Sequence, residues 1–130
     1  MLKNIIFRIL FIGWLVFVTF SSLFSFSGVD ATELNVPNLD KLVHFTFYFG
    51  MVFLGTLAIK EHLGKQFKLA KTLFTMVLLS ILYGIIIELV QYSFTENRQG
   101  DFFDAIANTV GALVGMFVAK YLISRSWPLK

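Results

Sequence analysis

Charged and amide side chains recur at helical spacing inside the long apolar stretches of this 130-residue chain. These predicted binding residues are Asp40, Lys41, His44, Glu88, Gln91, Arg98, Asp101, Asp104 and Asn108. An imidazole beside a carboxylate can transfer protons, a Lys or Arg can bind a phosphate, and several carboxylates can hold a hard divalent cation. Because such groups are costly in hydrocarbon, their recurrence at the ends of apolar stretches predicts a functional site.

Several of these residues also have a simpler explanation. Asp40 and Asp101 stand where helices are expected to begin, so each can serve as an N-cap. A single His inside a membrane protein can be a structural hydrogen-bonding group. Glu88 fits a structural explanation least, because it lies in the apolar sequence YGIIIELVQY, where a carboxylate needs a partner. The candidate partners are His44, Arg98 and Lys41. His44 and Glu88 are therefore the candidates for acid–base catalysis, if the protein has any.

The composition indicates a membrane protein. Hydrophobic residues make up 57% of the chain and charged residues 15%, whereas soluble domains carry about a quarter charged residues. The absence of Cys excludes disulfides, iron–sulfur clusters and zinc–thiolate sites. With only two His residues, a metal site would have to use oxygen ligands, so none is predicted, and the cofactor is left unknown. The pI of about 9.3 comes without a nucleic-acid-binding motif, so nucleic acid is not an expected partner.

Four apolar runs are each close to the roughly 20 residues that a membrane-spanning helix needs. They cover residues 5–26, 40–59, 72–94 and 101–123. The predicted fold class is all-α, a four-helix transmembrane bundle. Residues 1–26 are expected to form an uncleaved anchor helix, because Ser-Phe-Ser before Gly28 is a poor cleavage site. Residues 38–123 are expected to form a three-helix core that carries the polar residues.

The distribution of basic residues predicts the orientation. With both termini in the cytoplasm, nine Lys and Arg residues fall on the inner side, and only Lys41 and Arg98 fall on the outer side. The inner residues are Lys3, Arg8, Lys60, Lys65, Lys68, Lys71, Lys120, Arg125 and Lys130. By the positive-inside rule, both termini are expected in the cytoplasm and the polar residues near the outer leaflet.

Helical spacing predicts that the polar residues meet. Steps of three and four residues keep side chains on one face of a helix, as from Asp40 through His44 to Tyr48. Tyr48 can alternatively be an interfacial anchor. On the last expected helix, Gly111 and Gly115 continue the polar face and form a small-residue strip, which favours close packing of another helix.

Three motifs in order resemble those of the VanZ-like family. They are Asp40-Lys41-x-x-His44-Phe45-x-x-Tyr48, Glu88-x-x-Gln91, and Arg98-x-x-Asp101-x-x-Asp104-x-x-x-Asn108-x-x-Gly111-x-x-x-Gly115. The resemblance covers roughly residues 38–122 and includes the spacings. It implies a small integral membrane protein of the bacterial cell envelope, in a family named for its association with resistance to the glycopeptide teicoplanin.

Three functions are consistent with these residues. The leading hypothesis is a multi-pass protein of the bacterial cytoplasmic (inner) membrane, whose outer-leaflet polar pocket binds a lipid-linked or anionic envelope component. The second is a membrane-embedded hydrolase or transferase on a lipid-linked substrate, using His44 with Glu88, or a cation held by Asp40, Asp101 and Asp104. The third is a proton-coupled transporter or a structural membrane subunit, with membrane lipids and other copies of the chain as partners. Transport is disfavoured because the inner halves of the expected spans are almost wholly apolar.

Overall fold

The computed structural model describes residues 5–24, 39–94 and 102–125, which are all helical apart from short turns. Four α-helices follow one another: α1 (Ile6–Phe24), α2 (Leu39–Leu63), α3 (Leu69–Phe94) and α4 (Phe102–Ser124). Each is long and apolar enough to cross a membrane. The prediction of an all-α fold with four membrane-spanning helices is therefore confirmed.

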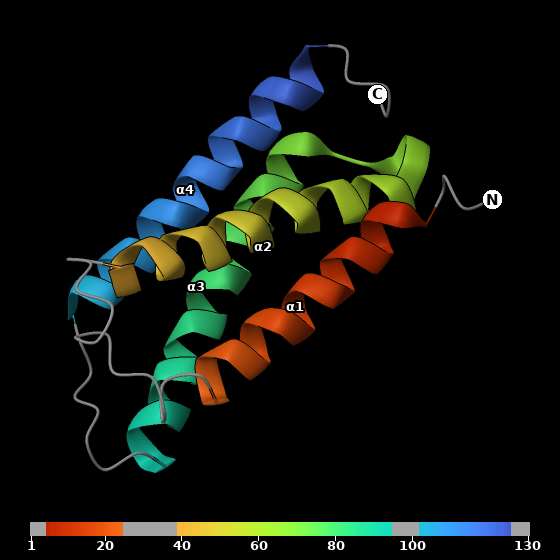
Figure 1. The fold of residues 1–130 in the computed structure, drawn as a ribbon. Coiled ribbons are helices and arrows are strands. Elements are labelled where there is room, and N and C mark those ends of the chain that lie inside the picture. The colour runs from red at the N-terminus through yellow and green to blue at the C-terminus, as the bar shows by residue number, and fades with distance from the viewer. Residues whose placement is uncertain (1–4, 25–38, 95–101, 126–130) are drawn as a thin grey trace.

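Successive helices run in opposite directions (Figure 1). The start of α1, the connection between α2 and α3, and the end of α4 therefore lie at one end of the molecule. We call this the basic end, because seven described cations belong to the segments that meet there. They are Arg8, Lys60, Lys65, Lys68, Lys71, Lys120 and Arg125. The opposite end, where α2 and α4 begin and α3 finishes, carries the described ones among the predicted binding residues: Lys41, His44, Glu88, Asp104 and Asn108.

Helix α2 is the centre of the fold, since it contacts each of the other three helices and packs most extensively on α4. Its buried residues Tyr48, Met51 and Val52 form a core with side chains of α1, α3 and α4. Large apolar side chains cover the outer faces of the bundle, where Phe74 of α3 and Phe20 of α1 are 65% and 60% exposed. Such exposure suits a protein whose surroundings are lipid rather than water.

Helix α1 is fixed to α2 by polar contacts as well as by apolar packing. The Trp14 indole N–H donates to the Phe47 carbonyl at 2.9 Å. At the basic end, the backbone N–H groups of Phe7 and Arg8 donate to the Glu61 carboxylate at 3.1 and 3.3 Å. Glu61 thus caps the first turn of α1 from another helix, where a carboxylate is favoured by unpaired N–H groups and by the helix dipole.

The connection between α2 and α3 is shorter than the sequence predicted. Helix α2 continues four residues beyond its expected end at Ile59, and α3 begins at Leu69 instead of Thr72. Helix α2 ends at Leu63, and the next residue, Gly64, has a φ of +58°, a backbone conformation that glycine adopts without strain. The intervening residues 64–66 form one turn of 3₁₀ helix, η3 (Gly64–Gln66).

Candidate functional site

Two side chains of α2 and two of α4 form a connected group, which we call the polar cluster: Lys41, His44, Asp104 and Asn108. The Lys41 ammonium lies 2.9 Å from Oδ1 of Asp104. On the same carboxylate, Oδ2 lies 3.6 Å from Nε2 of His44. The other imidazole nitrogen, Nδ1, is 2.9 Å from Oδ1 of Asn108. One carboxylate therefore faces both a cation and an imidazole.

Helical spacing explains why these four side chains converge. Lys41 and His44 are three residues apart on α2, and Asp104 and Asn108 are four apart on α4, so each pair shares a helix face. Helices α2 and α4 run in the same direction, with both pairs at their first turns. The two faces therefore meet at one level, at the end of the bundle opposite the basic end.

Two glycines of α4 bring its backbone close to that of α2, next to the polar cluster on the side of the basic end. A Cβ at Gly111 would lie 2.2 Å from the carbonyl oxygen of Phe45, and one at Gly115 would lie 2.7 Å from that of Phe49. Both distances are shorter than any tolerated contact, so only glycine fits here without moving a backbone. This close approach fixes α4 against α2 and thereby sets the distances within the polar cluster.

Three of the four side chains in the polar cluster are buried. His44, Asp104 and Asn108 are 5%, 6% and 6% exposed, whereas the Lys41 side chain is about one-quarter exposed. A buried carboxylate needs compensation, which the adjacent ammonium supplies as an ion pair. Oδ1 of Asp104 forms an ion pair with the Lys41 ammonium, and no other donor among the described residues is aligned with it.

His44 is placed to carry a proton. Both of its ring nitrogens face oxygen acceptors, Oδ1 of Asn108 and Oδ2 of Asp104. A neutral imidazole can donate from only one nitrogen, whereas an imidazolium can donate from both. The Nδ1 contact at 2.9 Å is a hydrogen bond, whereas Nε2 at 3.6 Å from Oδ2 is close to the carboxylate but beyond hydrogen-bonding distance.

Helix α3 closes the third side of the site through Gly84 and Glu88. A Cβ at Gly84 would lie 3.2 Å from the Tyr48 hydroxyl and 3.3 Å from Nδ2 of Asn108, so α3 touches the inner edge of the polar cluster. Glu88 follows one turn later on the same face, is half-buried, and lies within electrostatic range of Tyr48. The described parts of α2, α3 and α4 thus each contribute polar groups to one region.

The other predicted binding residues fall outside what the structure describes. Arg98 and Asp101 belong to residues 95–101, and the side chains of Asp40 and Gln91 are likewise not described. Among the described residues, no group of three His, Asp or Glu side chains could hold a metal ion. Two of the three carboxylates of the predicted cation site, those of Asp40 and Asp101, therefore lie outside what the structure describes.

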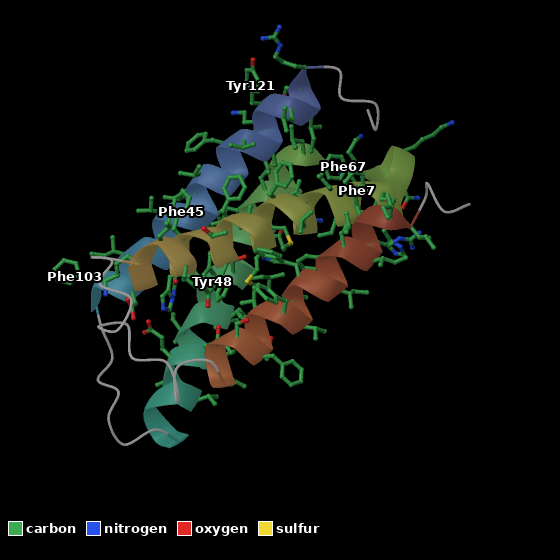
Figure 2. The ribbon with its side chains drawn as sticks, in the orientation of Figure 1. Phe7, Phe45, Tyr48, Phe67, Phe103 and Tyr121 are labelled. Atoms are coloured by element: carbon green, nitrogen blue, oxygen red, sulfur yellow. The ribbon has the colours of Figure 1, made fainter. Side chains whose placement is uncertain are left out.

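Two tyrosines extend the polar region into the bundle. Tyr48 is 2% exposed and lies in the middle of the bundle (Figure 2), so it is a core residue and not an interfacial anchor. Its ring packs against that of Tyr83, whose hydroxyl is hydrogen-bonded to Thr19 of α1. The spacing of Tyr48 four residues after His44 predicted its helix face, whereas the sequence gives no signal for the pairing of Tyr83 with Thr19.

The half of the bundle nearer the basic end is less uniformly apolar than the sequence suggested. The hydroxyl-bearing side chains of Thr56 and Ser80 are fully buried there, and neither oxygen has a hydrogen-bond partner among the described residues. Two isolated hydroxyls do not by themselves connect the polar cluster to the basic end.

A family model described as VanZ/LLP1 matches residues 2–124. The matched region includes α1 as well as the three helices that carry the polar motifs. No curated protein and no solved structure matches the chain.

Proposed function

The chain belongs to the VanZ/LLP1 family, and from this premise we propose that it is a cell-envelope protein of the bacterial inner membrane. Its polar cluster binds the head group of a lipid-linked or cell-surface component at the outer leaflet. A link to glycopeptide resistance follows only from the family resemblance and is part of the same proposal.

One observation carries the proposal: the polar cluster lies at the end of the bundle opposite the basic end. Packing alone does not require a buried carboxylate, imidazole and amide at one level, because each is costly in hydrocarbon. Since cytoplasmic loops carry the excess of Lys and Arg, the basic end belongs in the cytoplasm and the polar cluster near the outer surface. There, Lys41 can bind an anion while His44 and Asn108 bind uncharged polar groups.

A second candidate function is a membrane-embedded hydrolase or transferase acting on a lipid-linked substrate. It is favoured by the arrangement of His44, whose Nε2 faces the Asp104 carboxylate while Nδ1 contacts Asn108. A carboxylate that orients an imidazole is a recurring part of acid–base catalysis.

The orientation can be tested by chemical labelling, because the native chain has no Cys. We expect a single Cys at Asn97 to react with a membrane-impermeant maleimide on intact cells. A single Cys at Gln66, which is exposed in η3, should react only after lysis. Labelling of position 66 from outside would place the polar cluster in the cytoplasm and refute an outer-leaflet function.

The proposed function can be tested by measuring which lipids the protein retains. Wild-type protein, purified in mild detergent and exposed to a bacterial lipid extract, should retain a component that His44→Ala loses by about tenfold, as expected for a bond to a charged or buried polar group. Mass spectrometry of the extracted lipids measures this. Thr109→Ala is the matched control, because among the described residues the Thr109 hydroxyl bonds only within its own helix, to the Ala105 carbonyl at 2.9 Å. Identical lipid profiles for wild type and His44→Ala would contradict the proposal.

A further inference from the structure

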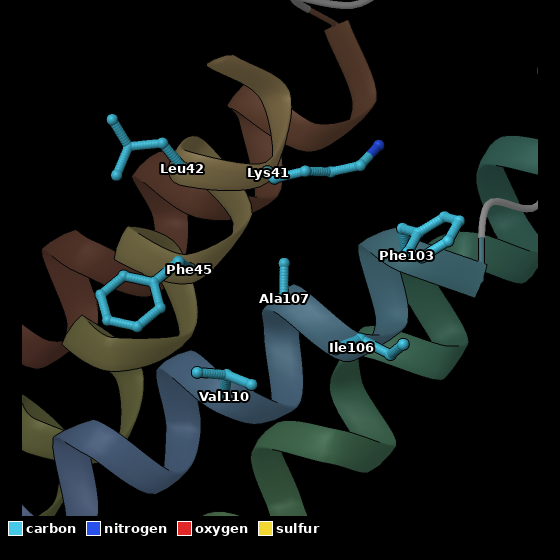
Figure 3. A pocket seen from close by; sticks show the side chains of 7 residues that line it. All are labelled: Lys41, Leu42, Phe45, Phe103, Ile106, Ala107 and Val110. Carbon is cyan, nitrogen blue, oxygen red and sulfur yellow. The ribbon is translucent and has the colours of Figure 1, made fainter. Parts of the chain in front are cut away.

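A groove of about 650 Å³ runs along the outer surface between the first turns of α2 and α4 (Figure 3). Its walls are Leu42 and Phe45 on α2, and Phe103, Ile106 and Val110 on α4. Its floor includes Ala107, whose small side chain leaves room between the larger ones. The volume is within the range of about 300–1,000 Å³ that small-molecule sites occupy.

The groove is apolar along its length and cationic at one end. Leu42, Phe103 and Ile106 are 60%, 65% and 42% exposed, so the walls meet whatever surrounds the bundle. Lys41 is the one charged residue that lines the groove among those described. A ligand that fits both features has a hydrocarbon chain and an anionic head.

The position of Lys41 distinguishes this groove from an ordinary lipid-facing surface. Its ammonium is held 2.9 Å from Asp104 at one end of the groove, and about one-quarter of its side chain is exposed beside the apolar walls. Lys41 stands in the first turn of α2, at the level where a spanning helix leaves the hydrocarbon and meets lipid phosphates. The width of the groove is fixed, because α4 packs closely on α2 at Gly111, one helical turn after Ala107.

We propose that this groove binds one acyl chain of an anionic, phosphate-bearing lipid, with the lipid phosphate on Lys41. The inference rests on the proposed function, and it identifies the bound component as a lipid that enters sideways from the membrane. The phosphate lies beside the Lys41–Asp104 pair, so the remaining head group extends from there toward His44 and Asn108. The chain lies along Phe45 and Ile106.

Site-directed photocrosslinking tests the groove directly, since the native chain has no Cys. A benzophenone maleimide is attached to a single Cys at Ile106 in the groove, or at Leu113, two turns along the same helix and outside it. These positions are matched in exposure, at 42% and 38%. The purified full-length protein is irradiated in detergent micelles that contain dioleoylphosphatidylglycerol or dioleoylphosphatidylcholine, and the lipid adducts are measured by mass spectrometry.

We expect position 106 to form about fivefold more adduct with the anionic lipid than with the zwitterionic one, as one surface cation provides. Position 113 should show no such preference. Lys41→Gln should remove the preference, whereas Lys120→Gln at the basic end should keep it. Ala107→Phe, which fills the groove, should reduce both adducts at position 106.

Equal adducts of the two lipids at position 106, or the same preference at position 113, would overturn the inference. These two comparisons do not depend on whether Lys41→Gln or Ala107→Phe folds. Neither result would affect the lipid-retention assay that compares wild type with His44→Ala. The proposed function would therefore be decided by that assay alone. Conversely, a preference for the anionic lipid at position 106 alone supports the groove. If no retained lipid is lost in His44→Ala, the proposed function then fails while the groove inference stands.

Discussion

Gly111→Ala should separate α2 from α4 and lower the free energy of unfolding by about 3 kcal/mol or more, at the upper end for overpacked sites. The added Cβ would lie 2.2 Å from the Phe45 carbonyl oxygen and 2.9 Å from the Phe45 Cα. These atoms belong to a helix backbone that cannot rotate away, so one helix must move. The thermal unfolding midpoint of the purified protein in detergent measures the loss.

The glycines of this chain provide a graded series that separates packing from helix propensity. Gly115→Ala should cost less than Gly111→Ala, because its nearest backbone atom is 2.7 Å away. Gly13→Ala is the control, since nothing lies within 4 Å of its Cβ position. There the substitution should stabilise α1 by roughly 0.5–1 kcal/mol, the usual advantage of Ala over Gly in a helix. Equal effects at positions 13 and 111 would show that the backbones of α2 and α4 do not approach as closely as described.

The number and the approximate position of the helices could be predicted, because hydropathy identifies the chain segments that are apolar enough to lie in the hydrocarbon core of a membrane. It does not measure where a helix ends, and α2 shows the difference. Beyond Ile59 the chain turns polar, yet the helix continues to Leu63 because Glu61 gains the N–H groups of Phe7 and Arg8 as partners. That contact joins residues more than fifty positions apart, so no local pattern in the sequence signals it.

Helical periodicity predicted which residues share a face, but it could not predict the pairs that they form. The sequence left His44, Arg98 and Lys41 as candidate partners of Glu88, and Arg98 lies outside the described residues. In the structure, Lys41 and His44 both face Asp104, and Tyr48 lies within electrostatic range of Glu88. Pairing depends on the axial offset between helices, which the close approach at Gly111 sets to within one turn.

His44→Ala and Asp104→Asn should each produce the full phenotype of a deletion strain, and the double variant should be no worse than either one alone. The reason is that the two side chains share one contact, Nε2 to Oδ2 at 3.6 Å, so that removing either disables the polar cluster. Residues that act as a unit lose most of the function at the first substitution. Susceptibility to envelope-targeting antibiotics, a glycopeptide included, measures the phenotype in a deletion strain that carries each variant.

Protein level in the membrane distinguishes a functional cluster from a structural one. Glu88→Gln and Arg98→Ala belong to the same prediction. All four variants should remain close to wild-type abundance, because none of these side chains takes part in the backbone contact between Gly111 and Phe45 that packs α4 on α2. Thr109→Ala, on the same helix but bonded only to its own backbone, should keep both abundance and function. If abundance instead falls in step with function across the four variants, the polar cluster serves to hold α2 and α4 together, and the binding role is refuted.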